Sequence, residues 1–171
     1  MKGRAVLLAS VLGALVLLSF SVQNVRAKGV VVDNFDSPAR TPKGLAWDGT
    51  HLWHADYYTG EIYELKTDGS WVSSFVPPGE KPGGLAWDGT HLWVGDFETD
   101  KIYELDTEGN VLKAINSPGS SPGTRPEGLA WDGTHLWVAV SRKETASGRL
   151  MQEAKIYELV LLQLNYVLFP S

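Results

Sequence analysis

Short apolar runs alternate with turn-forming residues along most of the chain, at the spacing of β-strands and not of helices. Residues 84–116 show the pattern most clearly, and they predict four strands: Gly84–Asp88, His91–Asp96, Lys101–Asp106 and Asn110–Asn116. The glycines in Asp88-Gly89-Thr90 and Thr107-Glu108-Gly109 suit tight hairpin turns. The first two strands are apolar on both faces, which predicts that they are buried between layers, whereas the fourth alternates like a half-exposed outer strand.

The ten-residue segment G-L-A-W-D-G-T-H-L-W occurs three times, beginning at Gly44, Gly84 and Gly128. Four antiparallel strands in about 40 residues, with buried inner strands, are typical of one blade of a β-propeller. A plain β-sandwich is the alternative, and the regular spacing of identical units disfavours it. We therefore predict an all-β fold, a β-propeller with three four-stranded blades that form a partial or half ring.

The positions at which the repeat pattern begins and ends are informative about the blades. Residues 29–35 match the predicted outer strands at 69–75 and 109–115, so we expect a further outer strand before the first blade. The third copy keeps K-I-Y-E-L at 155–159 and then loses the repeat pattern. Two hypotheses account for this: a truncated or frameshifted piece of a longer propeller, or a half ring that forms a homodimer of six blades.

The first 27 residues have the pattern of a secretory signal peptide. Lys2 and Arg4 precede an apolar run at 5–20, and Val25-Arg26-Ala27 resembles a cleavage site. A retained membrane anchor is the alternative, but this run is shorter than the roughly 20 residues that a membrane-spanning helix needs. We expect a signal-peptide helix at 1–27, propeller blades at 28–160 and an atypical apolar tail at 161–171. The predicted location is secreted or periplasmic, without membrane attachment after cleavage.

Charge and cysteine content narrow the function classes. Loss of Lys2, Arg4 and Arg26 with the leader would reduce 15 basic residues to 12 against 20 acidic residues, a net charge of −8. Such a chain repels nucleic acid phosphates, so we expect no nucleic acid partner. Cysteine is absent, which excludes disulfides and thiol chemistry.

Copies of G-L-A-W-D-G-T-H-L-W-V-x-D followed by K-I-Y-E-L-D-T-x-G resemble secreted bacterial and archaeal propellers. The group includes NHL-like, virginiamycin B lyase-like and glutaminyl-peptide cyclotransferase-like proteins. The resemblance covers residues 29–159 and implies the propeller fold. These proteins have six or seven blades, so this chain resembles a truncated member. The group includes enzymes and pure binding modules, and no catalytic motif of its enzymes matches residue by residue.

Residues that are identical in every copy are expected to serve the scaffold. The histidines His51, His91 and His135 would lie far apart on separate blades, so we expect local hydrogen bonds and no metal site. The acids Asp48, Asp88 and Asp132 are expected to cap turns. The tryptophan pairs of the repeat are expected in the core between blades, with carbohydrate stacking as the alternative. Trp71 differs, because its counterparts in the repeat are Val31 and Val111, and it is the better candidate for an exposed contact.

Residues that differ between copies fall in loops on one predicted face, where propellers generally bind. We predict that ligand-binding residues are among Lys43, His54, Asp56, Asp96, Glu127 and Arg142. We expect no catalytic residues, cofactor or metal, and no activity in this chain alone. The leading hypothesis is an exported scaffold that binds a small molecule, a glycan or a protein. The alternative is a fragment of a lyase-like or cyclotransferase-like propeller enzyme.

Overall fold

The computed structural model describes residues 31–119, 123–142 and 154–161. The predicted signal-peptide helix and nearly all of the predicted tail lie outside these residues. The chain divides into two units, Met1–Asn34 and Phe35–Ser171, which are described separately. Residues 31–34 of the first unit form no regular structure, and the strand expected at 29–35 is absent from its described part. Within the described residues, no helix is long and apolar enough to cross a membrane.

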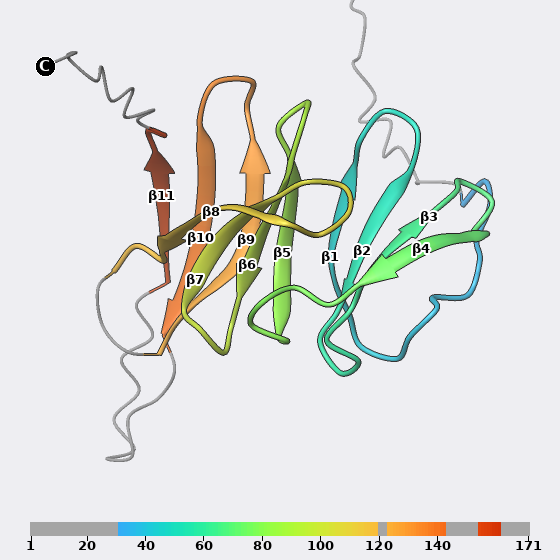
Figure 1. Cartoon of the computed structure of the whole chain (residues 1–171), viewed down its shortest axis with the longest axis horizontal. Helices are drawn as coiled ribbons and strands as arrows, with labels where there is room; N and C mark the ends of the chain where they lie inside the picture. Colours follow the sequence, from blue (N-terminus) through green and yellow to red (C-terminus); the bar gives the residue numbers. More distant parts are fainter. Residues whose placement is uncertain (1–30, 120–122, 143–153, 162–171) are drawn as a thin grey trace, which may run out of the picture. The chain divides into compact units, whose positions relative to one another are not determined.

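The second unit consists of three antiparallel sheets, and each sheet corresponds to one copy of the repeat (Figure 1). The first sheet has the order β1-β2-β3-β4, the second β5-β6-β7-β8, and the third β11-β10-β9. Their strands are β1 (Pro42–Trp47), β2 (Leu52–Asp56), β3 (Ile62–Leu65), β4 (Trp71–Phe75), β5 (Pro82–Trp87), β6 (Leu92–Asp96), β7 (Lys101–Leu105), β8 (Val111–Asn116), β9 (Thr124–Trp131), β10 (Leu136–Arg142) and β11 (Lys155–Leu159). This all-β architecture confirms the predicted blades.

Register is the same in each sheet, because the same turn closes each first hairpin. Trp47 pairs with Leu52, Trp87 with Leu92, and Trp131 with Leu136. The glycine of each Asp-Gly turn has a φ between +101° and +103°, a conformation that side chains with a Cβ rarely adopt. The conserved turn therefore fixes which side chains face each side of a sheet.

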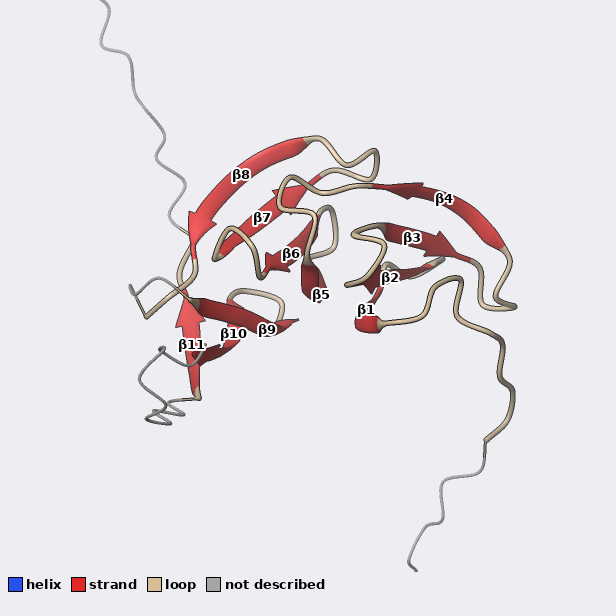
Figure 2. Cartoon of the chain, turned by 90° about the horizontal axis from the view of Figure 1, so that it is seen from below, coloured by secondary structure: helices blue, strands red, loops and turns tan. Residues whose placement is uncertain are grey.

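The core lies between successive sheets, which follow one another in an arc (Figure 2). Contacts join β1 to β5 and β5 to β9, the first strands of the three repeats. Trp53 of the first sheet packs in a cluster with Leu85 and Leu92 of the second. Trp93 of the second sheet packs in the same way with Leu136 and Val138 of the third. Burial on both faces of the second sheet explains its apolar strands.

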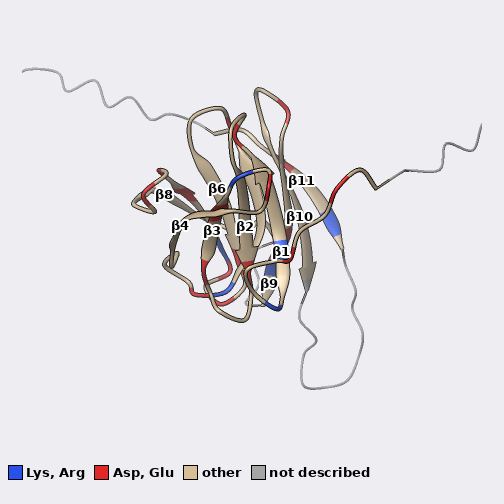
Figure 3. Ribbon diagram, turned by 90° about the vertical axis from the view of Figure 1, so that its right-hand side faces the viewer, with Lys and Arg blue, Asp and Glu red and all other residues tan. Residues whose placement is uncertain are grey.

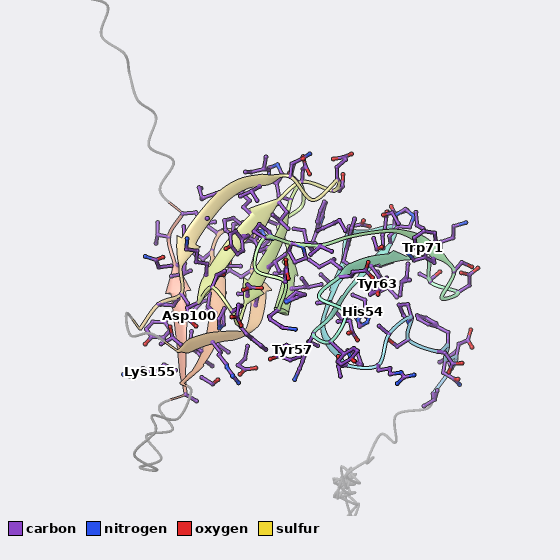
Figure 4. All side chains as sticks on the ribbon, turned by 60° about the horizontal axis from the view of Figure 1, so that its bottom comes forward. His54, Tyr57, Tyr63, Trp71, Asp100 and Lys155 are labelled. Atoms are coloured by element: carbon purple, nitrogen blue, oxygen red, sulfur yellow. The ribbon has the colours of Figure 1, made fainter. Side chains whose placement is uncertain are left out.

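Trp53 and Trp93 are fully buried, as expected of residues between blades, whereas Trp47 remains 48% exposed. Trp71 lies on β4, the outer strand of the first sheet, and 64% of its surface is exposed (Figure 4). The two kinds of tryptophan thus have different roles. Trp53 and Trp93 build the core between sheets, and Trp71 offers an exposed aromatic surface on an outer strand.

Candidate functional site

Each sheet contains one hydrogen-bond network that involves the invariant residues. The Asp48 Oδ1 atom accepts hydrogen bonds from the amides of Thr50 and His51, both at 2.7 Å. Its Oδ2 atom accepts a hydrogen bond from the Trp53 indole at 2.8 Å. The His51 Nδ1 atom lies 3.1 Å from Glu64 Oε1 on β3. The carboxylate therefore closes the turn and orients the buried tryptophan.

The second and third sheets repeat this network with nearly the same distances. The tryptophan–aspartate bond is 2.8 Å for Trp93 and Asp88, and 2.7 Å for Trp137 and Asp132. Burial disfavours the charged form of Asp48, but hydrogen bonds from His51, Trp53 and Thr50 outweigh this effect and hold its pKa below the ordinary value. The hydrogen bond from Trp137, followed by those from the His135 and Thr134 amides, lowers the pKa of Asp132 to about 2.

Potential metal-ligand atoms come close together in two of these networks. Asp48, His51 and Glu64 place one such atom each within 4.8 Å of one another, as do Asp88, His91 and Glu104. In both groups the aspartate already accepts three hydrogen bonds from its own turn and tryptophan. Each histidine thus interacts with acidic residues of its own sheet, and the histidines of different sheets do not come together in either group.

A second set of aspartates lies at the C-terminal ends of β2 and β6, away from the Asp-Gly turns. These aspartates anchor the loops that follow the two strands. Asp56 and Asp96 are fully buried. Asp56 accepts hydrogen bonds from the Thr41 amide at 2.6 Å and the Thr59 amide at 2.9 Å. Burial opposes its ionisation, but the bonds from Thr59, Thr41 and Tyr58 hold its pKa below the ordinary value.

Asp96 makes the corresponding contacts in the second sheet. It accepts hydrogen bonds from the amides of Lys81 and Thr99, both at 2.9 Å. Each aspartate thus ties the segment that enters the first strand of its sheet to the loop that follows the second strand. Val140 occupies the equivalent position in the third sheet. Asp56 and Asp96 were predicted to bind a ligand, and in the structure their carboxylates are occupied by the chain's own loops.

The anchored loops carry a group of cations and aromatic rings. Tyr57 follows Asp56 directly, Phe97 follows Asp96, and the centroids of the two rings lie 5.8 Å apart at an angle of 45°. Lys81 lies over the Tyr57 ring at 5.1 Å from its centroid, and Arg125 lies over the Phe97 ring at 5.8 Å. Lys43 also faces Tyr57, at 5.9 Å. We call these five residues the cation–aromatic cluster.

Relative position in the repeat explains why the cluster forms. Lys81 and Arg125 occupy equivalent positions at the start of successive blades, and Tyr57 and Phe97 occupy equivalent positions after the second strand. Each cation therefore lies over the ring of the preceding blade. Gly83 leaves the space that Phe97 fills, since a Cβ there would lie 2.4 Å from the ring. Its counterparts are Lys43 and Glu127.

The predicted site residues do not all meet. Lys43 belongs to the cation–aromatic cluster. Glu127 is exposed, and its Oε1 atom accepts a hydrogen bond from the Ser141 hydroxyl at 2.7 Å. His54 is buried on a face of the first sheet, where its ring stacks on Tyr63 at 5.9 Å and bonds to Ser37 at 3.2 Å. Burial, the largest effect, lowers the pKa of His54. Arg142 ends β10, and its side chain lies outside the described part of the structure.

Figure 4 shows the separation between Tyr57, which lies toward the second sheet, and the pair His54 and Tyr63 within the first. Four members of the cluster (Tyr57, Lys81, Phe97 and Arg125) were not among the predicted site residues. The signal for them was present: an aligned comparison shows Tyr57, Phe97 and Ser141 in one variable column, and Thr41, Lys81 and Arg125 in another. Acidic residues, by contrast, are spread over loops and turns of the molecule (Figure 3).

Comparison with known proteins shows the fold. No protein-family model matches the chain, and no curated protein matches it either. The solved structures similar to it include a catalytically inactive virginiamycin B lyase from Staphylococcus aureus with quinupristin, at 20% identity and a TM-score of 0.50 over 74% of this chain. A streptogramin B lyase is similar at 18% identity and a TM-score of 0.50 over 75% of this chain. The chain spans 44% of the length of each. These likenesses show the β-propeller fold.

Proposed function

We propose that the protein is an exported β-propeller binding module. Its ligand would carry an anionic group next to a ring with an apolar face, as in an acidic sugar or an aromatic acid. The observation that supports this proposal is the cation–aromatic cluster, in which three cations surround two rings from successive blades. Aromatic faces stack on ring-shaped ligands, and a guanidinium or ammonium group beside them binds a carboxylate.

The electrostatic setting favours this choice of ligand. The chain has a formal net charge of −5, so a group of three cations is a local exception that would select an anion. The buried carboxylates of Asp56 and Asp96 fix the backbone on either side of the cluster. A surface held in place in this way loses little conformational entropy when a ligand binds.

The proposal can be tested with glucuronate and benzoate as anionic probes, and with glucose and benzyl alcohol as their neutral counterparts. Saturation-transfer NMR would detect binding. We expect the two anions to bind and the neutral probes to bind less well. Lys81→Gln and Arg125→Gln should weaken anion binding. Lys66→Gln is the matched control, because Lys66 lies in the exposed turn between β3 and β4. Equal binding of neutral and anionic probes would contradict the proposal.

The alternative function is that of a fragment of a propeller enzyme. Its support is the likeness in fold to the two lyases, one of which was solved with quinupristin. Incubation of the chain with quinupristin, followed by mass spectrometry of the products, tests this alternative directly. Turnover that Glu127→Gln abolishes would favour the enzyme. Absence of turnover together with anion binding would favour the binding module.

Export rests on the pattern of residues 1–27 and needs its own experiment. The full chain would be expressed in a bacterium, and the mass of the exported product would be measured. We expect a product that begins at Lys28, since cleavage after Ala27 follows the signal-peptide pattern. A product that keeps the leader and sediments with membranes would contradict export as a free protein.

A further inference from the structure

Each sheet has two different faces, which the repeat defines. The face that packs against the next sheet carries an Ala, a Trp and an Ile from its first three strands, and we call it the forward face. The face that packs against the previous sheet carries Leu residues from the same strands, and we call it the back face. The forward residues are Ala46, Trp53 and Ile62, then Ala86, Trp93 and Ile102, then Ala130, Trp137 and Ile156; the back residues begin with Leu45, Leu85 and Leu129.

Two of these faces have no sheet packed against them among the described residues, although Phe35 and Ser37 cover part of the back face of the first sheet, where His54 is buried. Leu85 on the back face of the second sheet is 4% exposed, but the equivalent Leu45 of the first sheet is 63% exposed. Ile62 and Ile102 on forward faces are fully buried, but the equivalent Ile156 of the third sheet is 74% exposed. One molecule thus presents both halves of the interface that it already makes twice internally. The exposed back face is hollowed between Phe35, Leu45, Leu52 and His54.

Phe35 shows what should lie against that back face. At the end of β4, Phe75 packs on Gly109 of the following sheet, where a Cβ would lie 2.6 Å from the ring. Phe35 packs on Gly69 in the same way, since a Cβ at Gly69 would lie 2.5 Å from its ring. Phe35 therefore occupies the position of an outer-strand residue in a blade that precedes the first. The inner strands of that blade are missing from the described residues, and the part of the third sheet that the structure describes has three strands and no outer one.

We propose that a second copy of this chain supplies the missing strands. The third sheet of one copy would lie with its forward face on the back face of the first sheet of the other. Residues 31–35 of that other copy would add to the edge of β11 that no described strand covers. Two copies joined in this way form a closed ring of six blades, within the range of four to eight that propellers show. Closure within one chain would give three blades, and three copies would give nine.

The register of the composite blade follows from the complete ones. Tyr63 pairs with Ser74 and Tyr103 with Ala114, so Tyr157 should pair with Asn34 of the other copy. By the same rule Glu158 should pair with Asp33. At the equivalent positions of the second sheet, Glu104 pairs with Lys113, and the Lys113 Nζ atom lies 3.6 Å from Glu104 Oε2. Two carboxylates directly opposite each other weaken strand pairing. The proposal thus predicts that Asp33→Lys, which copies the second blade, tightens the dimer several-fold.

The first experiment measures the mass of the full chain, as the host produces it, by light scattering and sedimentation over a range of concentrations. We expect two chains per particle. Leu45→Glu and Ile156→Glu should each weaken association about a hundredfold or more, because each buries an unpaired charge only in the dimer. Leu112→Glu is the matched control, since Leu112 lies on outer strand β8 and is 50% exposed. All three positions are exposed in one copy, so folding should survive.

The second experiment exploits the absence of cysteine. Residues opposite each other on antiparallel strands have Cα atoms about 4.5–5.5 Å apart, which suits a disulfide. The variant with Asn34→Cys and Tyr157→Cys should form a disulfide between two chains, and Val32→Cys with Tyr157→Cys should form it much more slowly. A monomer at every concentration, a dimer that survives Leu45→Glu and Ile156→Glu, open filaments, or a disulfide within one chain would each overturn the proposal.

Discussion

Substituting alanine for the first glycine of each repeated segment tests how the sheets stack. A Cβ at Gly84 would lie 2.8 Å from the Gly128 Cα atom and 2.9 Å from the Glu127 carbonyl oxygen of the next sheet. A Cβ at Gly44 would lie 2.4 Å from the Gly83 carbonyl oxygen. At Gly128 the nearest atom is the Ala139 Cβ at 3.6 Å, an ordinary contact. The nine residues that follow the glycine are identical at all three positions, so the main difference in what an added Cβ meets is the neighbouring sheet.

The size of the effect follows from what must move. Backbone atoms cannot swing aside as a flexible side chain can, so an added methyl group at Gly44 or Gly84 must push two sheets apart. Overpacking of this kind costs about 1–3 kcal/mol. Alanine is otherwise favoured over glycine in a strand by about 0.5–1 kcal/mol. We therefore expect Gly84→Ala to be less stable than Gly128→Ala by about 2 kcal/mol, which corresponds to about 4–8 °C in Tm for a chain of this size.

The measurement is urea and thermal unfolding of the three variants, followed by tryptophan fluorescence and circular dichroism. The background should carry Leu45→Glu, so that association of two copies does not contribute. A common slope against urea would show that the variants unfold from the same compact state. If Gly84→Ala and Gly128→Ala prove equally stable, the close approach of successive sheets at these glycines is wrong.

Three further predictions concern the polar groups. Asp88→Ala should lower the free energy of unfolding by about 2–3 kcal/mol, because it leaves the buried Trp93 indole without a hydrogen-bond partner. Tryptophan fluorescence during urea unfolding measures this change. Asp68→Ala, in an exposed turn, is the control. The pKa values of Asp48 and Asp56 are lowered on folding, so their contribution to stability is complete above the unfolded pKa near 3.8. This contribution is lost as the pH falls through the folded pKa values. Acid unfolding of the Asp56→Asn variant should therefore occur at a higher pH than that of the unmodified chain. The pKa of His54 is lowered on folding, so stability should be full above its ordinary pKa near 6.5 and decline as the pH falls below that value. His54→Val, which copies Val94 and Val138, should remove this decline. The free energy of unfolding measured between pH 5 and 8 tests the prediction.

Much of the fold could be predicted from sequence because the repeat is an alignment within one molecule. The strand expected at Lys101–Asp106 is found at Lys101–Leu105, and that expected at Asn110–Asn116 is found at Val111–Asn116. Periodicity fixes which strands are buried, and the Asp-Gly turn fixes their register. Residues 31–35 match the outer strands equally well and yet form none, because a strand also needs a partner beside it.

The candidate site was harder to predict for a physical reason. Asp56 and Asp96 attract attention as acids at the end of a strand, but sequence does not show that backbone amides from two loops already surround each carboxylate. Lys81 and Tyr57 lie in different blades, so their proximity depends on how sheets stack. Variation between copies correctly directs attention to these loops. It does not distinguish residues that hold the loops from residues that the loops present.

Identical segments of this chain lie in different environments. The exposed fractions of their equivalent residues therefore show which sheets have a neighbour on a given face. Trp53 and Trp93 are each 1% exposed, whereas Trp137, with the same neighbours in sequence and the same hydrogen bond to its aspartate, is 36% exposed. Because the local structure is the same, the added exposure reflects the absence of a following sheet from the part of the chain that the structure describes. A large apolar face that is buried in two of three copies is shaped for the back face that covers it there. The open forward face of the third sheet and the open back face of the first are the two kinds of face that pack together twice within the molecule, and the proposed ring of two copies rests on that match.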